Sequence, residues 1–396
     1  MVNRIFLPIV LGTLLPYLWI IRHECKCLLG MRHVHALLWL PAAIIIGYSA
    51  YLALLPGFVP DNPLLVDVWF ILMALCAVPQ FVYAFFSFVG WCCQRRLHTR
   101  RNWGRWIGGC MSVIAFAAFI YGFTIGFRNL EVKRVTVYLD DLPKAFDGYR
   151  IVQFSDIHLG SFYGWRHDIP QRDIDSINAQ HADLICFTGD LQNAQPTELY
   201  PYRKLLSSLK ARDGVYSILG NHDYSYYVDV KPEEKAAFEK KIQDLERSLN
   251  WHLLNNEHAV IRRGRDSIYL AGTENYDNPK HASVSKALYG IRPGNFILML
   301  QHIPTQWKYM TPSTINQVYG SRDTVLVAPQ LTLSGHTHAG QVEVLGLRPT
   351  LFAAYDYGLY EREGCQLYTT AGLGGVVPIR IGATAEIVVL TLKKRK

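Results

Sequence analysis

The chain has 396 residues, of which 50% are apolar and 18% are charged. This composition excludes a disordered protein, and the length allows two or three domains. The net charge of +8 is unevenly distributed, because residues 1–127 contain 9 Lys and Arg against 3 Asp and Glu, whereas the rest of the chain contains 31 against 29. The excess basic charge therefore accompanies apolar N-terminal segments. This indicates orientation in a membrane and argues against nucleic acid as a partner.

Four stretches without a charged residue predict transmembrane helices at residues 5–21, 36–56, 68–91 and 107–127. A helix needs about 20 apolar residues to cross a hydrocarbon core of roughly 30 Å, so the first stretch is the marginal one. A cleaved signal peptide is the alternative for it, but no small-residue cleavage site precedes the next basic stretch. Since no Asp, Glu, Lys or Arg lies within the four stretches, we expect a membrane anchor rather than a transport pathway.

The loops between these stretches predict how the chain is oriented. Arg22, Lys26 and Arg32 lie between the first and second stretches, and five arginines between residues 95 and 105 lie between the third and fourth. Lys and Arg are retained on the cytoplasmic side of a membrane. We therefore expect a multi-pass protein of the inner (plasma) membrane, with residues 1–127 as its membrane domain and residues 128–396 as an extracytoplasmic domain.

Residues 128–396 alternate apolar strand patterns with helical ones, which predicts an α/β fold. Helices are expected at 168–180 and at 232–248, the second being charge-rich and therefore a surface helix. Strands are expected at 132–140, 149–156, 182–190, 214–223, 267–273, 296–302, 331–336, 365–370 and 386–392.

Five of these strands end in polar residues that can bind metal. The carboxyl ends of strands are where sites assemble in α/β architectures, so we expect these side chains to converge. Imidazole together with carboxylate and amide oxygen suits borderline divalent ions such as Mn²⁺, Fe²⁺ or Zn²⁺, and seven ligands are too many for a single tetrahedral ion. They suit two divalent ions that share a bridging carboxylate. The candidates are Asp156, His158, Asp190, Asn221, His302, His336 and His338.

This ordered set of motifs resembles the calcineurin-like metallophosphoesterases, whose pattern is D-x-H, GD, GNH[D/E], H and GHxH. The five blocks stand here, unsubstituted and in the same order, as Asp156-Ile157-His158, Gly189-Asp190, Gly220-Asn221-His222-Asp223, His302 and Gly335-His336-Thr337-His338. The resemblance covers roughly residues 148–392. GNHDY, SGHTHAGQ and the ending YTTAGLGG…PIRIGATAEIVVLTL look like the membrane-associated bacterial branch of that family.

The resemblance implies a four-layer α/β/β/α sandwich and a role for each motif residue. It implies one ion on Asp156, His158 and His338, a second ion on Asn221, His302 and His336, and Asp190 as the bridge. It also implies His222 as the general acid that protonates the leaving group, with Asp223 behind it to orient it. The expected activity is hydrolysis of a phosphodiester or phosphomonoester, probable substrates being lipids or other envelope phosphoesters.

Three alternatives remain open from the sequence. A non-catalytic membrane receptor would use the same scaffold to bind a phosphorylated ligand. If the domain were cytoplasmic, hydrolysis of UDP-diacylglucosamine, which some relatives perform, would become the leading function. A transporter with a regulatory domain is the third alternative, and the uncharged membrane stretches weaken it.

Overall fold

The computed structural model describes residues 2–24, 32–55, 62–228, 230–321 and 324–395. Lys26 and the start of the loop that follows the second apolar stretch lie outside these residues, so their part in the orientation argument rests on the sequence. The chain divides into two compact units, Met1–Ile125 and Gly126–Lys396. We describe each unit by itself.

The first unit consists of apolar helices, as expected. Among the described residues, three segments are long and apolar enough to cross a membrane, namely Ile5–His23, Leu64–Leu97 and Gly104–Arg128, and a shorter apolar segment covers Trp39–Leu54. The marginal first stretch is therefore among the three long ones, and the second stretch corresponds to the shorter one. The helices are α1 (Val2–His23), α2 (Arg32–Leu54), α3 (Pro63–Leu72), η2 (Met73–Ala77), α4 (Val78–Leu97) and α5 (Gly104–Thr124).

The third apolar stretch forms one long helical segment in which a π-helix lies between two α-helices. The segment η2 between α3 and α4 is a π-helix, and Pro79 follows it at the start of α4. Proline lacks a backbone N–H and its ring collides with the preceding turn, so an ordinary α-helix cannot pass through it undisturbed. A wider π turn is a common way to absorb such a defect.

Helices α4 and α5 approach each other closely because glycines face their contact. A Cβ atom added to Gly104 would lie 2.0 Å from the carbonyl oxygen of Phe86, and one added to Gly108 would lie 2.9 Å from that of Tyr83. Small residues spaced four apart on a helix allow this kind of backbone contact in membranes, where dispersion rather than water drives association. The pair Gly104 and Gly108 therefore sets the distance between α4 and α5.

The second unit contains two six-stranded sheets. The first has the order β1-β12-β2-β3-β4-β5 and the second has the order β10-β11-β9-β8-β7-β6. The strands of the first sheet are β1 (Leu130–Leu139), β12 (Ala385–Lys394), β2 (Arg150–Phe154), β3 (Leu184–Phe187), β4 (Val215–Ser217) and β5 (His252–Leu253). Those of the second are β10 (Gly358–Arg362), β11 (Cys365–Thr369), β9 (Leu331–Ser334), β8 (Phe296–Leu300), β7 (Asp266–Gly272) and β6 (Glu257–Arg263).

Alternating side chains on these strands divide the interior into three apolar layers. On β8, Leu298 belongs to the core between the two sheets, whereas Met299 belongs to the core on the outer face of the second sheet. Successive residues of a strand point to opposite faces, so a strand that is covered on both sides is apolar throughout. The outer core of the first sheet includes Ile174 and Ile242, which come from α6 (Ile169–Asn178) and α8 (Pro232–Ser248).

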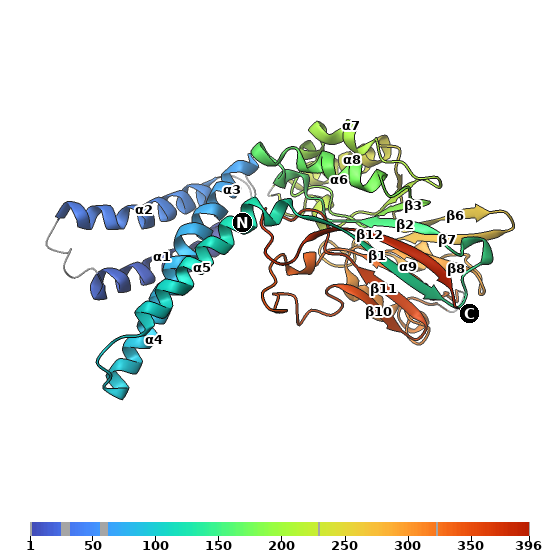
Figure 1. Ribbon diagram of the computed structural model, residues 1–396. Coiled ribbons are helices and arrows are strands. Elements are labelled where there is room, and N and C mark those ends of the chain that lie inside the picture. Colours follow the sequence, from blue (N-terminus) through green and yellow to red (C-terminus); the bar gives the residue numbers. More distant parts are fainter. Residues whose placement is uncertain (1, 25–31, 56–61, 229, 322–323, 396) are drawn as a thin grey trace. The chain divides into compact units, whose positions relative to one another are not determined.

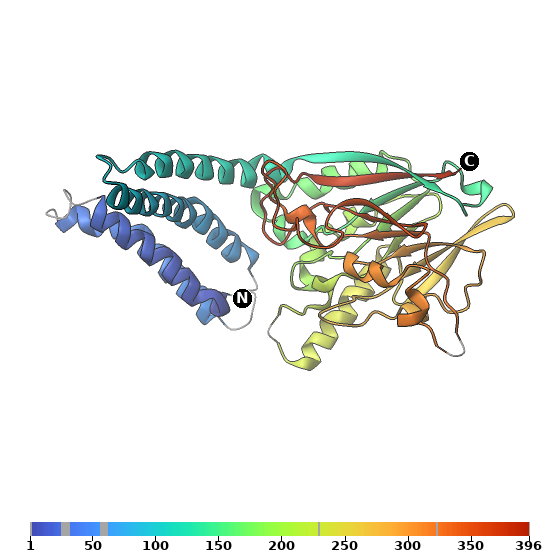
Figure 2. The same cartoon turned by 90° about the horizontal axis from the view of Figure 1, so that it is seen from below.

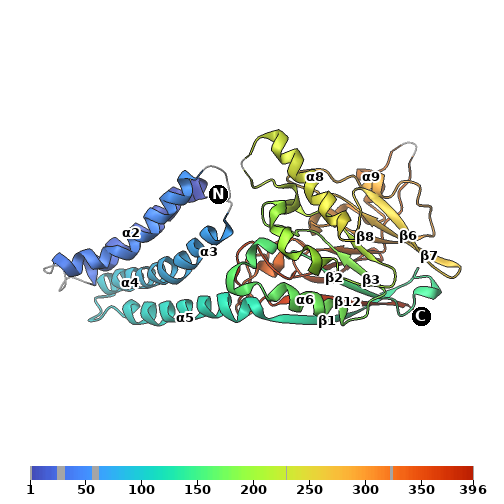
Figure 3. The same cartoon turned by 90° about the horizontal axis from the view of Figure 1, so that it is seen from above.

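The resulting architecture is the expected sandwich of helices, sheet, sheet and helices. In Figure 1, α6, α7 (Arg203–Leu206) and α8 lie above the strands, and Figure 3 shows α6 and α8 from that side. The outer face of the second sheet is covered by shorter helices, including α9 (Val284–Ala287), η9 (Pro304–Tyr309) and α10 (Ile315–Val318), some of which appear in orange in the view from below (Figure 2).

Some elements differ from the expectation. The strand expected at 214–223 is reduced to β4, because the chain turns away at Gly220 into the short helix η8 (Asn221–Tyr224). Strands β5, β6 and β10 are present without having been predicted. The helix α8 has the predicted bounds, but it is not only a surface helix, since Glu246 on it is fully buried and accepts a hydrogen bond from the Ser217 hydroxyl at 2.7 Å.

The core between the sheets generates a stability prediction. Leu298 is fully buried there, so Leu298→Ala removes apolar contacts and leaves a cavity, and we expect it to lower the free energy of unfolding by about 2–5 kcal/mol. Urea unfolding of the detergent-solubilised full chain, followed by near-UV circular dichroism, measures the change. Leu359→Ala on β10 is the matched control, because that side chain is 44% exposed. Equal losses for the two variants would contradict this assignment of the core.

Candidate metal centre

The seven candidate ligands come from loops that follow five strands. Asp156 and His158 follow β2, Asp190 follows β3 and Asn221 follows β4, all in the first sheet. From the second sheet, His302 follows β8, and the pair His336 and His338 follows β9. Within each sheet these strands run parallel, so their carboxyl ends meet at one edge. The two sheets thus contribute ligands to the same place.

Asp156, His158 and His338 form the first ligand set. The Nε2 atoms of His158 and His338 lie 3.3 Å apart, and Nε2 of His338 lies 3.6 Å from Oδ1 of Asp156. One ligand atom from each residue falls within 4.8 Å of the others. Asp156 is held in place from the other sheet, because the backbone N–H of His336 donates to both of its carboxylate oxygens, at 3.1 and 3.0 Å.

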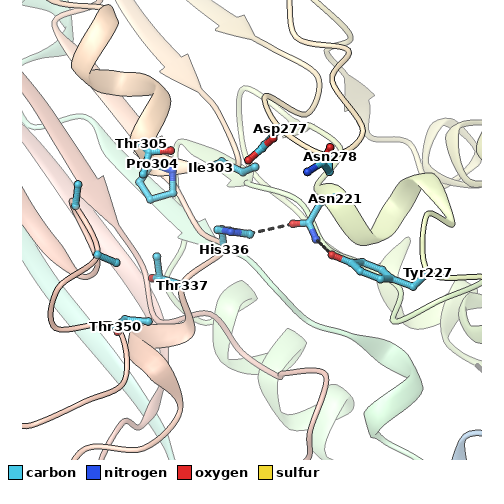
Figure 4. A pocket seen from close by; sticks show the side chains of 12 residues that line it. Asn221, Tyr227, Asp277, Asn278, Ile303, Pro304, Thr305, His336, Thr337 and Thr350 are labelled. Atoms are coloured by element: carbon cyan, nitrogen blue, oxygen red, sulfur yellow. Dashed lines mark hydrogen bonds between the residues drawn. The ribbon is translucent and has the colours of Figure 1, made fainter. Parts of the chain in front are cut away.

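Asn221, His302 and His336 form the second ligand set. The Oδ1 atom of Asn221 lies 3.1 Å from Nε2 of His302 and 2.9 Å from Nδ1 of His336. The amide nitrogen of Asn221 donates to the hydroxyl of Tyr227 at 3.0 Å, and the amide oxygen points toward His336 (Figure 4). The ring of His302 is fixed from behind, because its Nδ1 lies 2.7 Å from the carbonyl oxygen of Thr188.

Asp190 lies between the two sets. Its Oδ2 atom is 3.2 Å from Nε2 of His302 and 3.6 Å from Nε2 of His158. Its Oδ1 atom accepts the backbone N–H of His222 at 2.8 Å. A single carboxylate oxygen therefore faces one imidazole of each set.

The electrostatics of this cluster differ from one imidazole to the next and keep the Asp190 carboxylate charged. Burial lowers the pKa of His158 to about 3 and that of His336 to about 4, and positive charge on neighbouring imidazoles adds to the effect. Burial alone would also lower the pKa of His302, but the Asp190 carboxylate outweighs it and raises that pKa. Burial opposes ionisation of Asp190, but the imidazoles of His302 and His222 outweigh it and hold its pKa well below the usual value.

Most of the ligands lie on strained backbone. Five of the seven, Asp156, His158, Asp190, His336 and His338, have φ between 51° and 76°. Residues with a side chain rarely adopt this left-handed conformation, and each one costs on the order of 1–3 kcal/mol. The strand-end loops therefore hold their side chains against a local preference of the chain, which is typical of functional sites.

Glycines allow the loops to approach one another. Gly189 has φ of 95°, as expected for a tight turn, but Gly220 and Gly335 are needed for a different reason. A Cβ atom on Gly220 would lie 2.2 Å from Oδ1 of Asp190, and one on Gly335 would lie 2.3 Å from Oδ2 of Asp156. At these two positions a side chain would occupy the space of the metal-binding carboxylates.

His222 lies at the edge of the cluster and is partly exposed. A ring nitrogen of His222 is within 4.8 Å of ligand atoms of His158 and Asp190. Its Nδ1 lies 2.6 Å from the carbonyl oxygen of Asn193. Because a carbonyl only accepts, Nδ1 carries a hydrogen and donates it, which leaves Nε2 as the nitrogen that can exchange a proton.

The position of Asp223 differs from the expectation that it lies behind His222. The described contacts of its carboxylate are with four backbone N–H groups: Oδ2 accepts from Asp190 and Gly220 at 2.8 and 2.9 Å, and Oδ1 accepts from Leu191 and Gln192 at 2.9 and 3.2 Å. The group that orients His222 is the Asn193 carbonyl. A backbone acceptor carries no residue-type signal, so motif reasoning had no means of identifying it. Asp223 instead ties the Asp190 loop to the Asn221 loop.

The C-terminal segment contacts the loop that carries Asp156 and His158. The N–H of Gly374 donates to the carbonyl of Asp156 at 2.8 Å, and a Cβ atom on Gly374 would lie 1.8 Å from the carbonyl oxygen of Ile157. The buried guanidinium of Arg380 holds this segment by donating to the carbonyls of Ala371 and Gly374 at 2.7 and 2.6 Å. Arg380 is thus a positioning residue that lies outside the five motifs.

The chemistry of the donors fits divalent metal ions. Imidazoles, two buried carboxylates and an amide oxygen converge, and the facing nitrogens of His158 and His338 are both potential ligands to one cation. The ring of His302 also has an outer partner of the kind that orients metal-binding histidines, namely the carbonyl of Thr188. The residues present therefore fit the cofactor that the motifs imply.

A pocket of about 490 Å³ opens beside the second ligand set (Figure 4). Asn221 and His336 lie on its wall, together with hydroxyl and small apolar side chains. Among the described residues that line it, Asp277 is the only Asp, Glu, Lys or Arg. The pocket is lined by Asn221, Tyr227, Asp277, Asn278, Ile303, Pro304, Thr305, His336, Thr337, Thr350, Ala353 and Ala354.

The contacts of Asp223 generate a prediction that separates its two roles. In Asp223→Asn an amide nitrogen would face two backbone N–H donors, so we expect the Asp190 loop to loosen and Mn²⁺ affinity to fall by about 10- to 100-fold. Isothermal titration with Mn²⁺ measures the affinity, and Asp244→Asn on the exposed face of α8 is the control. Unchanged affinity with a shifted pH optimum of hydrolysis would instead mean that Asp223 acts on His222.

Comparison with known proteins finds relatives for both units of the chain. Residues 149–340 match the calcineurin-like phosphoesterase family, and residues 3–127 match a family described as a probable calcineurin-like phosphoesterase transmembrane domain. A zebrafish (Danio rerio) transmembrane protein with metallophosphoesterase domain is 32% identical over 293 residues, which span 71% of this chain and 62% of that protein.

The matches to two bacterial relatives extend over a larger share of the relative's length. An uncharacterized metallophosphoesterase of Helicobacter pylori is 26% identical over 374 residues, 90% of each chain. Another from Bacillus subtilis is 27% identical over 314 residues, 73% of this chain and 96% of the relative. The chain therefore belongs to the calcineurin-like phosphoesterase family, with an N-terminal transmembrane domain.

Proposed function

We propose that the protein is a membrane-anchored phosphoesterase that uses two divalent metal ions. The observation that carries this proposal is the position of Asp190, whose Oδ2 atom faces His158 of the first ligand set and His302 of the second. A shared carboxylate is the ligand that a two-ion site needs and a single-ion site does not. Mn²⁺, Fe²⁺ and Zn²⁺ all suit the donors.

Each group of the chain then has a defined task. Bound divalent ions supply Lewis acidity toward the phosphoryl oxygens and lower the pKa of a nucleophilic water. Asp156, His158 and His338 hold one ion, and Asn221, His302 and His336 hold the other. His222 donates a proton from Nε2 to the departing alkoxide while the Asn193 carbonyl keeps its Nδ1 protonated and its ring oriented.

The pocket favours a phosphoester whose substituent on the phosphate is uncharged or cationic. Its described wall offers hydroxyls, small apolar groups and the Asp277 carboxylate, and a second phosphate placed there would meet no compensating cation. A lipid phosphodiester or another envelope phosphoester meets this requirement better than a pyrophosphate such as UDP-diacylglucosamine. A monoester with such a substituent also fits.

An extracytoplasmic catalytic domain follows from the loop charges. One contact in the helical unit supports the assignment of both basic loops to one side: Arg105, at the start of α5, pairs with Glu24, just after α1, at 2.9 Å. Alkaline phosphatase fused after Lys396 should therefore be active. A fusion that is active only as a cytoplasmic reporter would reverse the topology and make UDP-diacylglucosamine the first substrate to test.

A receptor that only binds a phosphorylated ligand is the second candidate. It would need neither Asp190 as a shared ligand nor His222 with its proton-exchanging nitrogen directed at the cluster. The presence of both groups favours the enzyme.

The first test of the enzyme is metal-dependent hydrolysis of bis(p-nitrophenyl) phosphate by the full chain in detergent with added Mn²⁺. Asp190→Asn removes the charge that faces both ligand sets, so we expect turnover to fall at least about 1000-fold. Asp244→Asn, on the exposed face of α8, should retain full turnover. Bound metal without turnover of diesters or monoesters would contradict the enzyme and favour the receptor.

The role of His222 is tested by the leaving group. If His222 protonates the alkoxide, His222→Ala should slow hydrolysis of a p-nitrophenyl ester modestly and that of an alkyl ester by about 100- to 10,000-fold, because only the alkoxide needs a proton. Metal content by mass spectrometry should be unchanged. An equal loss for both esters would show that His222 only positions the substrate.

A further inference from the structure

The segment between β9 and β10 exposes a group of apolar side chains. We call residues 342–358 the apolar loop and five of its side chains the apolar tip. Leu345 is 98% exposed and Phe352 is 97% exposed. An exposed apolar cluster on a folded protein marks a surface that is covered by a partner or a membrane. The tip consists of Val344, Leu345, Leu347, Leu351 and Phe352.

The turn that carries the tip is well defined. Val344 and Leu347 exchange two backbone hydrogen bonds, at 2.9 and 3.0 Å, around Leu345 and Gly346, whose φ values are 52° and 78°. Turns of this kind favour Asn or Gly at both central positions, because other residues are strained there. Leu345 therefore combines backbone strain with full exposure. The strain belongs to the turn, whereas the full exposure of Leu345 is explained if the side chain enters an apolar phase.

The tip carries no charge that opposes entry into such a phase. Between residues 344 and 355 Arg348 is the only charged residue. Its guanidinium is directed to the base of the loop, where Nη1 pairs with Glu343 at 2.9 Å and Nε pairs with Asp356 at 2.7 Å. The loop therefore presents leucines and a phenylalanine, while Arg348 is paired with two carboxylates at the base of the loop.

We propose that the apolar tip inserts into the boundary between headgroups and acyl chains of the bilayer in which the chain is anchored. Only residues 125–129 separate the end of α5 from the start of β1, so a bilayer is always within reach of this domain. An apolar surface without net charge gains free energy in proportion to the area that it buries there. The membrane is thus the partner whose chemistry matches the tip.

The loop also connects the membrane with the metal centre. Thr350, Ala353 and Ala354, which flank the tip residues Leu351 and Phe352, line the pocket beside the second ligand set. The inserted loop would place that pocket at headgroup depth. This consequence rests on the proposed function, because it makes the headgroup phosphoester of a membrane lipid the substrate.

The test is photo-crosslinking from the loop in the full chain. Phe352→p-benzoylphenylalanine keeps an aromatic side chain at the tip, and the protein is reconstituted into vesicles of phosphatidylcholine and phosphatidylglycerol and irradiated. Leu347→p-benzoylphenylalanine is the second tip variant. Tyr289→p-benzoylphenylalanine is the control, because Tyr289 is 70% exposed but precedes β8, at the end of that strand opposite to His302.

We expect mass spectrometry to find phospholipid adducts at residues 352 and 347 and at least tenfold fewer at residue 289. Crosslinked dimers of the chain at the tip would show that a second copy covers it and would overturn the proposal, as would equal lipid adducts at all three positions. Hydrolysis of bis(p-nitrophenyl) phosphate is measured on the same samples. Since crosslinking needs no turnover, lipid adducts without hydrolysis would reject the proposed function and leave membrane insertion supported.

Discussion

The burial of the Asp190 carboxylate is the constraint on which the rest of the site depends. A charge removed from water must be compensated by hydrogen bonds and opposite charge, and Asp190 receives the N–H of His222 on one oxygen and faces His302 and His158 with the other. To place it there, the chain needs Gly189 at positive φ and a Gly220 without a side chain. The strand ends, the turns and the ligand sets are arranged around one ionised group.

This arrangement is possible because the sheets beneath it are rigid. Five of the candidate ligands have a left-handed conformation, which is uncommon even for Asp and His, the side chains that tolerate it better than most. The compensation comes from the core between the sheets, where residues such as Leu298 and Leu333 are fully buried. Apolar packing in one part of the domain thus keeps the backbone strained in another.

Much of the fold was predictable because the strands that carry the motifs are covered on both faces. Such strands are continuous apolar runs, and β2, β3, β8 and β9 could be recognised for this reason. Strands β6 and β10 lie at the edges of the second sheet and expose much of their surface, so they lack that signal. β5 has only two residues, too few to show a period.

The site was likewise predictable only in part. Side-chain chemistry and spacing pointed to residues that the folded chain brings together as candidate metal ligands, whereas contacts made by the backbone left no trace in the motifs. The Asn193 carbonyl that orients His222 and the four N–H groups that hold Asp223 are of this second kind. Arg380 and Tyr227 lie outside the motifs and contact groups six to nine residues away, namely the carbonyls of Ala371 and Gly374 and the Asn221 amide.

The short connection between α5 and β1 has a kinetic consequence. Five residues span no more than roughly 17 Å even when extended, so the catalytic domain cannot diffuse away from its own membrane. For a lipid substrate of the kind proposed, the quantity that governs the rate would be the mole fraction of that lipid in the bilayer rather than a bulk concentration. Diluting the vesicles would leave the rate per enzyme unchanged, whereas diluting the substrate lipid within them would lower it.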